Sequence, residues 1–221
     1  MSYKTSCCFC NSILREVISL GHHPHSDYFP QNLKKTIFTY PLNLARCTSC
    51  GLYQTDFHLN TNTMFNDEYI YDNSINISGS KHWDKMANDI NNKIKQYKKF
   101  DENLRILDIG SNSGDLISSF QRLNWIGVGI EPSTKPFEIA EQRGIKTINK
   151  FYNYSVVNEL PYEDFDLITF TNSFPHIPNP LDTLKLSKEL IKKPSGIICI
   201  ESPSSEKMID EGQYDQIYHQ H

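Results

Sequence analysis

The chain has 221 residues, of which 38% are hydrophobic and 22% are charged, and its formal net charge is -4 at pH 7. This length allows one or two globular domains. The slightly acidic charge argues against a general nucleic-acid-binding protein, and no apolar stretch approaches the roughly 18 residues that span a membrane. The first residues lack the apolar core of a secretion signal, so we expect a cytoplasmic protein whose six cysteines bind metal or stay reduced.

Two Cys-x-x-Cys motifs lie near the N-terminus, formed by Cys7 with Cys10 and by Cys47 with Cys50. Four thiolates suit the tetrahedral coordination of Zn²⁺ and leave no position for water. The sequence therefore predicts a structural zinc site in a domain of residues 1–60, with a redox-active Cys-x-x-Cys pair as the alternative. We expect the extra thiol, Cys8, to point away from the metal.

The region around the second cysteine motif is expected to contain short strands. The pattern predicts one strand over residues 36–44 and a second over 52–54 that pairs with it. The histidines at 22, 23 and 25 are read as part of an exposed loop and not as metal ligands. Residues 61–100 are expected to form a connector that becomes helical from Ser80, where apolar residues recur at steps of three and four.

A glycine-bearing turn follows an apolar strand over residues 104–110, and a helix follows the turn. Such a turn lets a ligand approach the backbone at the N-terminus of a helix. The turn is neither a P-loop nor the Gly-x-Gly-x-x-Gly motif, which disfavours an NAD-dependent enzyme. The next strand, 125–130, ends in Glu131, where an acid is placed to accept hydrogen bonds from both ribose hydroxyls.

Further strands are predicted over residues 145–148, 166–170 and 196–200, and a helix is predicted over 181–191. Strands that alternate with helices favour an α/β fold with a parallel, doubly wound sheet. Ligands of such sheets bind beyond the carboxyl ends of the strands.

Several segments together resemble class I S-adenosylmethionine-dependent methyltransferases, and in particular the zinc-containing C-methyltransferases of nucleotide-linked keto-deoxysugars. Besides the first cysteine motif, they are YPLNLARCTSCGLYQ at 40–54, EYIYDNSINISGSKHW at 68–83, SNSG at 111–114, NSFPHIPNP at 172–180 and QYDQIYHQH at 213–221. The resemblance implies a Rossmann-like methyltransferase domain over residues 101–221, S-adenosylmethionine as cofactor and a sugar nucleotide as substrate. The cofactor-binding residues that it implies are Tyr71, Asp108, Gly110, Asn112, Gly114, Glu131 and Asn172.

Methylation of a carbon atom requires a base that removes a proton next to a carbonyl group, and histidine is the usual choice. The resemblance places His176, Tyr218 and His221 around the sugar. The related enzymes have a glutamate where this chain has Gln220, and an amide cannot take up the proton. Either His176 or His221 is therefore expected to be the base, or C-methylation is impaired, and His219 is expected to be structural. The alternatives are O- or N-methylation, or a non-catalytic relative that needs a partner chain.

The family's sheet has seven strands, whereas the pattern predicts five, so the chain is expected to lack the family's C-terminal part. The 196–200 strand would then form an exposed sheet edge, and its unpaired backbone groups would favour pairing with another chain. We therefore expect a homo-oligomer or a complementing chain at this edge, and neither nucleic acid nor membrane as a partner.

Overall fold

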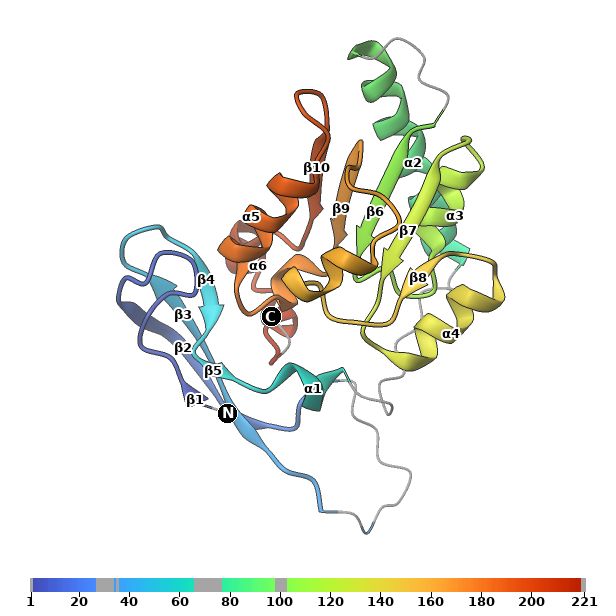
Figure 1. The fold of residues 1–221 in the computed structure, drawn as a ribbon. Helices are drawn as coiled ribbons and strands as arrows, with labels where there is room; N and C mark the ends of the chain where they lie inside the picture. The colour runs from blue at the N-terminus through green and yellow to red at the C-terminus, as the bar shows by residue number, and fades with distance from the viewer. Residues whose placement is uncertain (1, 27–33, 35, 66–76, 98–102, 220–221) are drawn as a thin grey trace. The chain divides into compact units, whose positions relative to one another are not determined.

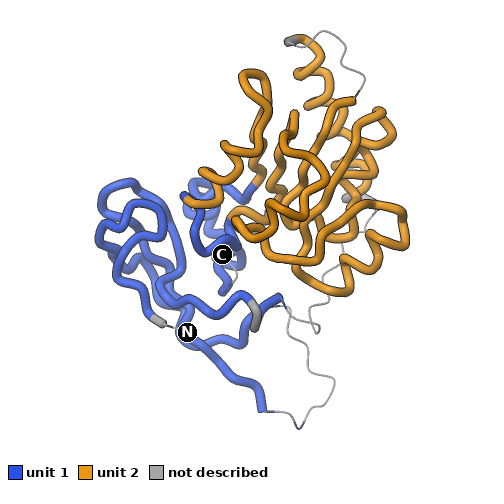
Figure 2. Tube along the Cα trace, in the orientation of Figure 1, with its two compact units in different colours: residues 1–69, 175–181, 202–221 blue, residues 70–174, 182–201 orange. Residues whose placement is uncertain are grey.

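The computed structural model describes residues 2–26, 34, 36–65, 77–97 and 103–219 of the chain. The chain forms two compact units (Figure 2). Unit 1 contains residues 1–69, 175–181 and 202–221, and unit 2 contains residues 70–174 and 182–201. The predicted division at residues 60 and 100 stays a prediction, because the units describe spatial proximity and not independent folding.

Unit 1 contains an antiparallel sheet in the order β2-β3-β4 (Figure 1). Its strands are β2 (Leu14–His23), β3 (Tyr40–Cys47) and β4 (Tyr53–Thr55). β4 pairs with β3 as expected, but β3 begins and ends later than the predicted 36–44 strand. β2 was not predicted from the sequence. Almost all of its side chains are exposed, so buried and exposed positions do not alternate along the strand.

The remaining elements of unit 1 are short. β1 (Ser2–Tyr3) pairs with β5 (Phe57–His58), and one turn of helix, α1, covers Thr61–Met64. From the C-terminal part of the chain come α6 (Ser205–Asp210) and the 3-10 turn η4 (Tyr214–Gln216). The expected loop around residues 22–25 is wrong in part, because His22 and His23 belong to β2.

Unit 2 contains a five-stranded parallel sheet in the order β10-β9-β6-β7-β8 (Figure 1). Its strands are β6 (Arg105–Ile109), β7 (Ile126–Ile130), β8 (Thr147–Ile148), β9 (Leu167–Thr171) and β10 (Ile197–Glu201). All the pairings are parallel. The predicted doubly wound sheet of five strands is confirmed.

The helices between residues 77 and 190 are α2 (Ile77–Tyr97), α3 (Asp115–Gln121), α4 (Thr134–Gln142) and α5 (Pro180–Leu190), with the 3-10 segments η2 (Tyr154–Glu159) and η3 (Phe174–His176). They belong to unit 2, except that the end of η3 and the start of α5 lie within residues 175–181 of unit 1. α2 packs against the strand and helix of the first βα unit. Trp83, Ala87 and Ile94 share a buried cluster with Ile106 of β6 and Phe120 of α3. α2 is thus an integral part of the core, where the sequence predicted a connector.

β10 is an edge strand within the described part of the chain, where its partner is β9. Ile197 and Ile200 on this strand are 37% and 41% exposed. An apolar edge of this kind is normally covered in native proteins. Among the described helices, none is both long and apolar enough to cross a bilayer.

Candidate functional site

The four cysteines of the two Cys-x-x-Cys motifs converge in unit 1. The Sγ atoms of Cys7, Cys10, Cys47 and Cys50 all lie within 4.8 Å of one another. The Cys7–Cys50 and Cys10–Cys47 pairs are separated by 3.7 and 3.4 Å. Four sulfurs at 2.3 Å from a tetrahedral Zn²⁺ would lie about 3.8 Å apart. The donor set and its spacing fit zinc with all four positions filled.

Local backbone geometry builds this thiol cluster. Asn11 and Gly51 follow the two motifs, and both have positive φ angles, 59° and 77°. Only residues that tolerate the left-handed region turn the chain back so tightly. Hydrogen bonds from the side chain and backbone of Ser12 lower the pKa of Cys10 to about 6, whereas burial and hydrogen bonds with the neighbouring thiols raise the pKa of Cys50.

Cys8 lies outside this group of ligands. Its backbone N–H donates to the side-chain oxygen of Gln54 at 2.9 Å. Burial raises the pKa of the Cys8 thiol to about 11, so the sulfur stays protonated at neutral pH. The described histidines of the N-terminal region, His22, His23 and His25, are also absent from the cluster.

In the glycine-bearing turn between β6 and α3, the backbone N–H groups of residues 110 to 114 all have acceptors within the protein. The N–H groups of residues 110 and 111 donate to the carbonyl of Ile130, and that of residue 114 donates to the carbonyl of Ser111. The N–H groups of residues 112 and 113 donate to the Glu131 carboxylate and to the Asn112 side chain. The turn therefore offers a rigid shape and not a set of free donors for phosphate, which agrees with the absence of a P-loop motif.

Two glycines in this turn are required by space as well as by conformation. Gly110 and Gly114 have φ angles of 71° and 80°. A Cβ atom on Gly110 would lie 2.6 Å from the Cβ of Ser173, and one on Gly114 would lie 2.5 Å from Cδ1 of Ile145. Asn112 also has a positive φ, 49°, which asparagine tolerates.

Glu131 lies directly after β7 and is 5% exposed. One carboxylate oxygen accepts the N–H of Asn112 at 2.9 Å, and the other accepts the N–H of Ser133 at 2.8 Å. Burial raises the pKa of this carboxyl group. A carboxylate has about four acceptor positions, so two remain for a ligand after these bonds. Glu131 thus ties the end of β7 to the glycine-bearing turn and keeps capacity to bind hydroxyl groups.

Asp108 lies within β6, beneath the turn, and is 1% exposed. Its carboxylate accepts a hydrogen bond of 2.7 Å from the hydroxyl of Thr169 on β9. Burial raises the pKa of Asp108 to about 7, and the nearby charge of Glu131 adds to this increase. This buried carboxyl group lies two residues before Gly110, where the chain enters the glycine-bearing turn.

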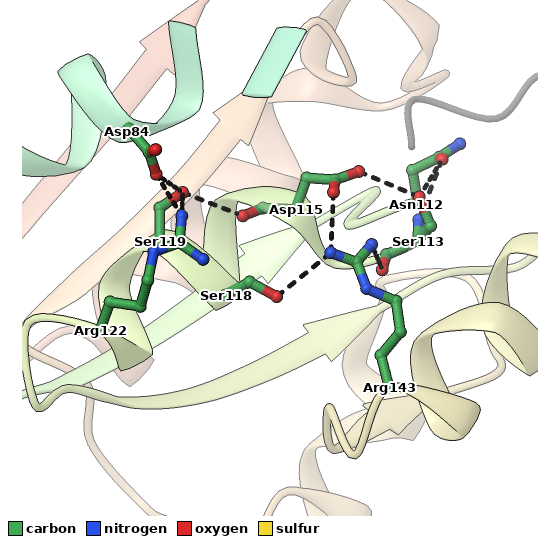
Figure 3. Close-up of polar contacts among 8 residues, drawn as sticks. All are labelled: Asp84, Asn112, Ser113, Asp115, Ser118, Ser119, Arg122 and Arg143. Atoms are coloured by element: carbon green, nitrogen blue, oxygen red, sulfur yellow. Dashed lines mark hydrogen bonds and ion pairs between the residues drawn. The ribbon is translucent and has the colours of Figure 1, made fainter. Parts of the chain in front are cut away.

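A cluster of polar side chains around Arg143 stabilises the glycine-bearing turn (Figure 3). Arg143, which follows α4, donates to the carbonyl oxygen of Ser113 at 2.8 Å and pairs with Asp115 at 2.9 Å. Asp115 also accepts the hydroxyl of Ser113 at 3.1 Å. The side chains of Arg143 and Asp115 are 33% and 16% exposed, so water screens this pair only in part. Sequence reasoning missed this cluster, because nothing local marks Arg143 as the partner of a turn 30 residues earlier.

A second polar group lies at the carboxyl ends of β9 and β10. Asn172, at φ 56°, donates its backbone N–H to the carbonyl of Glu201 at 2.8 Å. Nε2 of His82, on α2, lies 3.1 Å from both carboxylate oxygens of Glu201. Ser173 donates to the carbonyl of Ile109 and so joins this edge to the glycine-bearing turn. The rule that singled out Glu131, an acid at the carboxyl end of a parallel strand, would also have found Glu201.

The residues expected around the acceptor fall in unit 1 where the structure describes them. His176 is partly exposed, and its ring lies 5.7 Å from that of Phe65. Tyr218 is also partly exposed. Tyr71 and His221 lie outside the described residues, as does Gln220. The structure thus brings Asp108, Gly110, Asn112, Gly114, Glu131 and Asn172 together at one end of the unit 2 sheet.

Comparison with known families assigns both parts of the chain. A family model described as a methyltransferase domain matches residues 82–221, more than half of the chain. The chain belongs to this family. A second family model, described as "Putative zinc binding domain", matches residues 7–65, which include the four clustered cysteines.

Individual relatives of this methyltransferase-domain protein are distant. C-methyltransferase NovU of Streptomyces niveus is 24% identical over 184 residues, which cover 82% of this chain and 42% of NovU. Ubiquinone biosynthesis O-methyltransferase of Haemophilus ducreyi is 29% identical over 106 residues, 44% of each chain. The chain therefore spans less than half the length of these relatives.

Among solved structures, the plantazolicin methyltransferase BpumL in complex with a pentazolic desmethylPZN analog and SAH matches with a TM-score of 0.49 and 17% identity, over 60% of this chain and 50% of that one. The amino pentose methyltransferase CalS10 from Micromonospora echinaspora matches with a TM-score of 0.45 and 17% identity, over 55% of this chain and 51% of that one.

Proposed function

We propose that this chain binds S-adenosylmethionine beyond the carboxyl ends of β6 and β7 and belongs to an enzyme that methylates a carbon atom of a nucleotide-linked keto-sugar. The observation that carries the choice of C-methylation is the breadth of the similarity to NovU. The alignment covers 82% of this chain, more than the methyltransferase match over residues 82–221, so it includes part of the region before residue 82. The sugar-nucleotide substrate is the one that the sequence segments imply.

The cofactor would be held by the residues around the glycine-bearing turn. Bound S-adenosylmethionine supplies an electrophilic methyl group on a sulfonium. Glu131 accepts the two ribose hydroxyls with the acceptor positions that its backbone bonds leave open. Gly110 and Gly114 keep the turn in a shape that side chains would prevent. We assign Asp108, Asn112 and Asn172 to the same site and Tyr71 to its closure.

The acceptor side would be supplied by His176, Tyr218 and His221. An imidazole is suited to remove the proton next to a carbonyl group near neutral pH, and the amide of Gln220 is not. O-methylation is the second candidate, since the ubiquinone biosynthesis O-methyltransferase of Haemophilus ducreyi matches 44% of this chain.

We also propose a cytoplasmic location, supported by the free thiols of the described cysteines, and a pairing partner for the exposed edge of β10.

The first experiment is a calorimetric titration of the zinc-loaded chain with S-adenosylhomocysteine. In Glu131→Gln the amide nitrogen, itself a donor, would face a backbone N–H group. Only one side-chain oxygen would remain to accept hydrogen bonds. We expect the dissociation constant to rise at least about tenfold, because a hydrogen bond to a charged group contributes roughly 1.5–3 kcal/mol. Glu138→Gln, on the exposed side of α4, is the matched control and should bind like the wild type. A folded wild type that does not bind would refute the proposed cofactor.

The acceptor is tested separately with labelled S-adenosylmethionine and a nucleotide-linked 4-keto-6-deoxysugar. We expect label in a carbon-linked methyl group, identified by NMR of the product. His176→Gln should slow this transfer and leave the affinity for S-adenosylhomocysteine unchanged. An oxygen-linked methyl group would favour the second candidate instead.

A further inference from the structure

The C-terminal segment of the chain rests on the zinc-binding sheet. Ile217 is 8% exposed and forms a buried cluster with Leu42 and Leu44 of β3. Residues 42 and 44 lie on one face of the strand, because side chains alternate along β-structure. Residues that are about 175 positions apart in the sequence therefore share one small core inside unit 1.

His219 adds a polar anchor two residues later. It is 4% exposed, and its Nε2 lies 3.1 Å from the carbonyl oxygen of Pro41 and 3.3 Å from that of Tyr40. Carbonyl oxygens only accept, so the ring donates from Nε2. The ring also meets the Tyr40 ring edge to face, with centroids 6.1 Å apart. Burial lowers the pKa of His219, and the nearby His23 and His25 act in the same direction, so the imidazole stays neutral with its proton on Nε2.

One strand links this anchor to the metal site. β3 begins at Tyr40, whose carbonyl accepts from His219, and ends at the thiol ligand Cys47. β4 pairs with β3 only from Leu44 to Arg46, so among the described strands the first half of β3 has no partner on that side. β3 also pairs with β2 from Tyr40 to Cys47, so one paired strand joins the His219 anchor at its first residue to the thiol cluster at its last.

The two compact units separate the proposed roles. The described residues assigned to the cofactor all belong to unit 2, whereas His176 and Tyr218, assigned to the acceptor, belong to unit 1. We propose that the zinc-binding unit is the acceptor-substrate side of this protein and that His219 is a positioning residue that fixes Tyr218 on β3. The proposal rests on the proposed function for the roles of these residues. In this proposal zinc stabilises the unit that binds the acceptor and is not needed for cofactor binding.

The test is hydrogen–deuterium exchange of the zinc-loaded 221-residue chain, read on peptides that cover residues 213–219. His219→Leu keeps the bulk of the side chain and removes the Nε2 donor, so we expect exchange in these peptides to rise about tenfold, as the loss of one buried hydrogen bond implies. His219→Gln places an amide N–H at a similar reach and should restore exchange to within about threefold of the wild type. His22→Leu is the matched control, because His22 is exposed on β2 opposite Pro41, and it should exchange like the wild type.

Two further arms separate positioning from general stability. Removal of zinc with a chelator should raise exchange in residues 213–219 and leave the dissociation constant of S-adenosylhomocysteine within about twofold. Addition of dTDP-4-keto-6-deoxyglucose should slow exchange of the same peptides in the wild type and not in His219→Leu.

Unchanged exchange in His219→Leu, or failure of His219→Gln to restore it, would overturn the anchor. Loss of S-adenosylhomocysteine binding together with zinc would overturn the separation of roles. No response of the wild type to the keto-sugar nucleotide would overturn the acceptor assignment. A wild type that fails to bind S-adenosylhomocysteine at all would instead refute the proposed function, and the exchange experiment on the anchor is read without any cofactor.

Discussion

Asp108 gives a sharp prediction about stability, because its carboxyl group is buried without a positive partner among its described contacts. Burial raises its pKa from 3.8 to about 7. Asp108→Asn keeps an oxygen that accepts the Thr169 hydroxyl and removes the charge. We expect the variant to gain stability over the wild type as the pH rises.

The size of the gain follows from proton linkage. Between pH 3.8 and 7 the native protein holds a proton on Asp108 that the unfolded chain has released, so the wild type loses stability as the pH rises through this window. A shift of about three pKa units corresponds to roughly 4 kcal/mol in total. Between pH 5 and pH 8 the linkage relation gives a difference of about 2.5 kcal/mol between the variant and the wild type.

The measurement is urea unfolding of both proteins at pH 5 and pH 8, followed by tryptophan fluorescence. The chain has two tryptophans, Trp83 and Trp125, and both lie in the core of unit 2, so the signal reports on the sheet that contains Asp108. Glu163→Gln, at an exposed acid, is the control and should follow the wild type at both pH values. Equal pH dependence in Asp108→Asn and the wild type would refute the reasoning.

Two other predictions concern the glycine-bearing turn. Gly114→Ala should lose about 2–4 kcal/mol of unfolding free energy, because the new methyl group clashes with Ile145 at a position that also has a left-handed φ. Gly144→Ala is the control: its φ is 73° but the space around it is open, so it should lose only the roughly 1–2 kcal/mol of backbone strain. Equal losses in the two variants would contradict the clash with Ile145. Arg143→Leu should weaken S-adenosylhomocysteine binding about tenfold in calorimetry, because the Ser113 carbonyl loses its charged donor. Arg122→Leu should not weaken it, because Arg122 pairs with Asp84 and Ser119, which meet the turn's cluster only through the Asp115 carbonyl (Figure 3).

The cysteine motifs and the parallel strands were predictable because their signals are local. Two residues between thiolates suit one metal ion, and a fully buried strand such as β6 reads as an apolar run. β2 was not predictable, since its exposed side chains follow no period. The role of α2 was underestimated, because its periodic apolar face shows that it packs but not against which partner.

The sequence by itself determined which four cysteines cluster, the five-stranded sheet and the position of Glu131, because each depends on residue type and short-range spacing. Only the tertiary structure decided that Arg143, directly after α4, holds the turn and that His219 binds the carbonyls of β3. Both contacts join residues far apart in the chain, and a single sequence carries no record of which distant groups meet. The physical reason is that a donor shielded wholly or partly from water needs an acceptor within the protein, and the fold, not the local pattern, sets which acceptor is within reach.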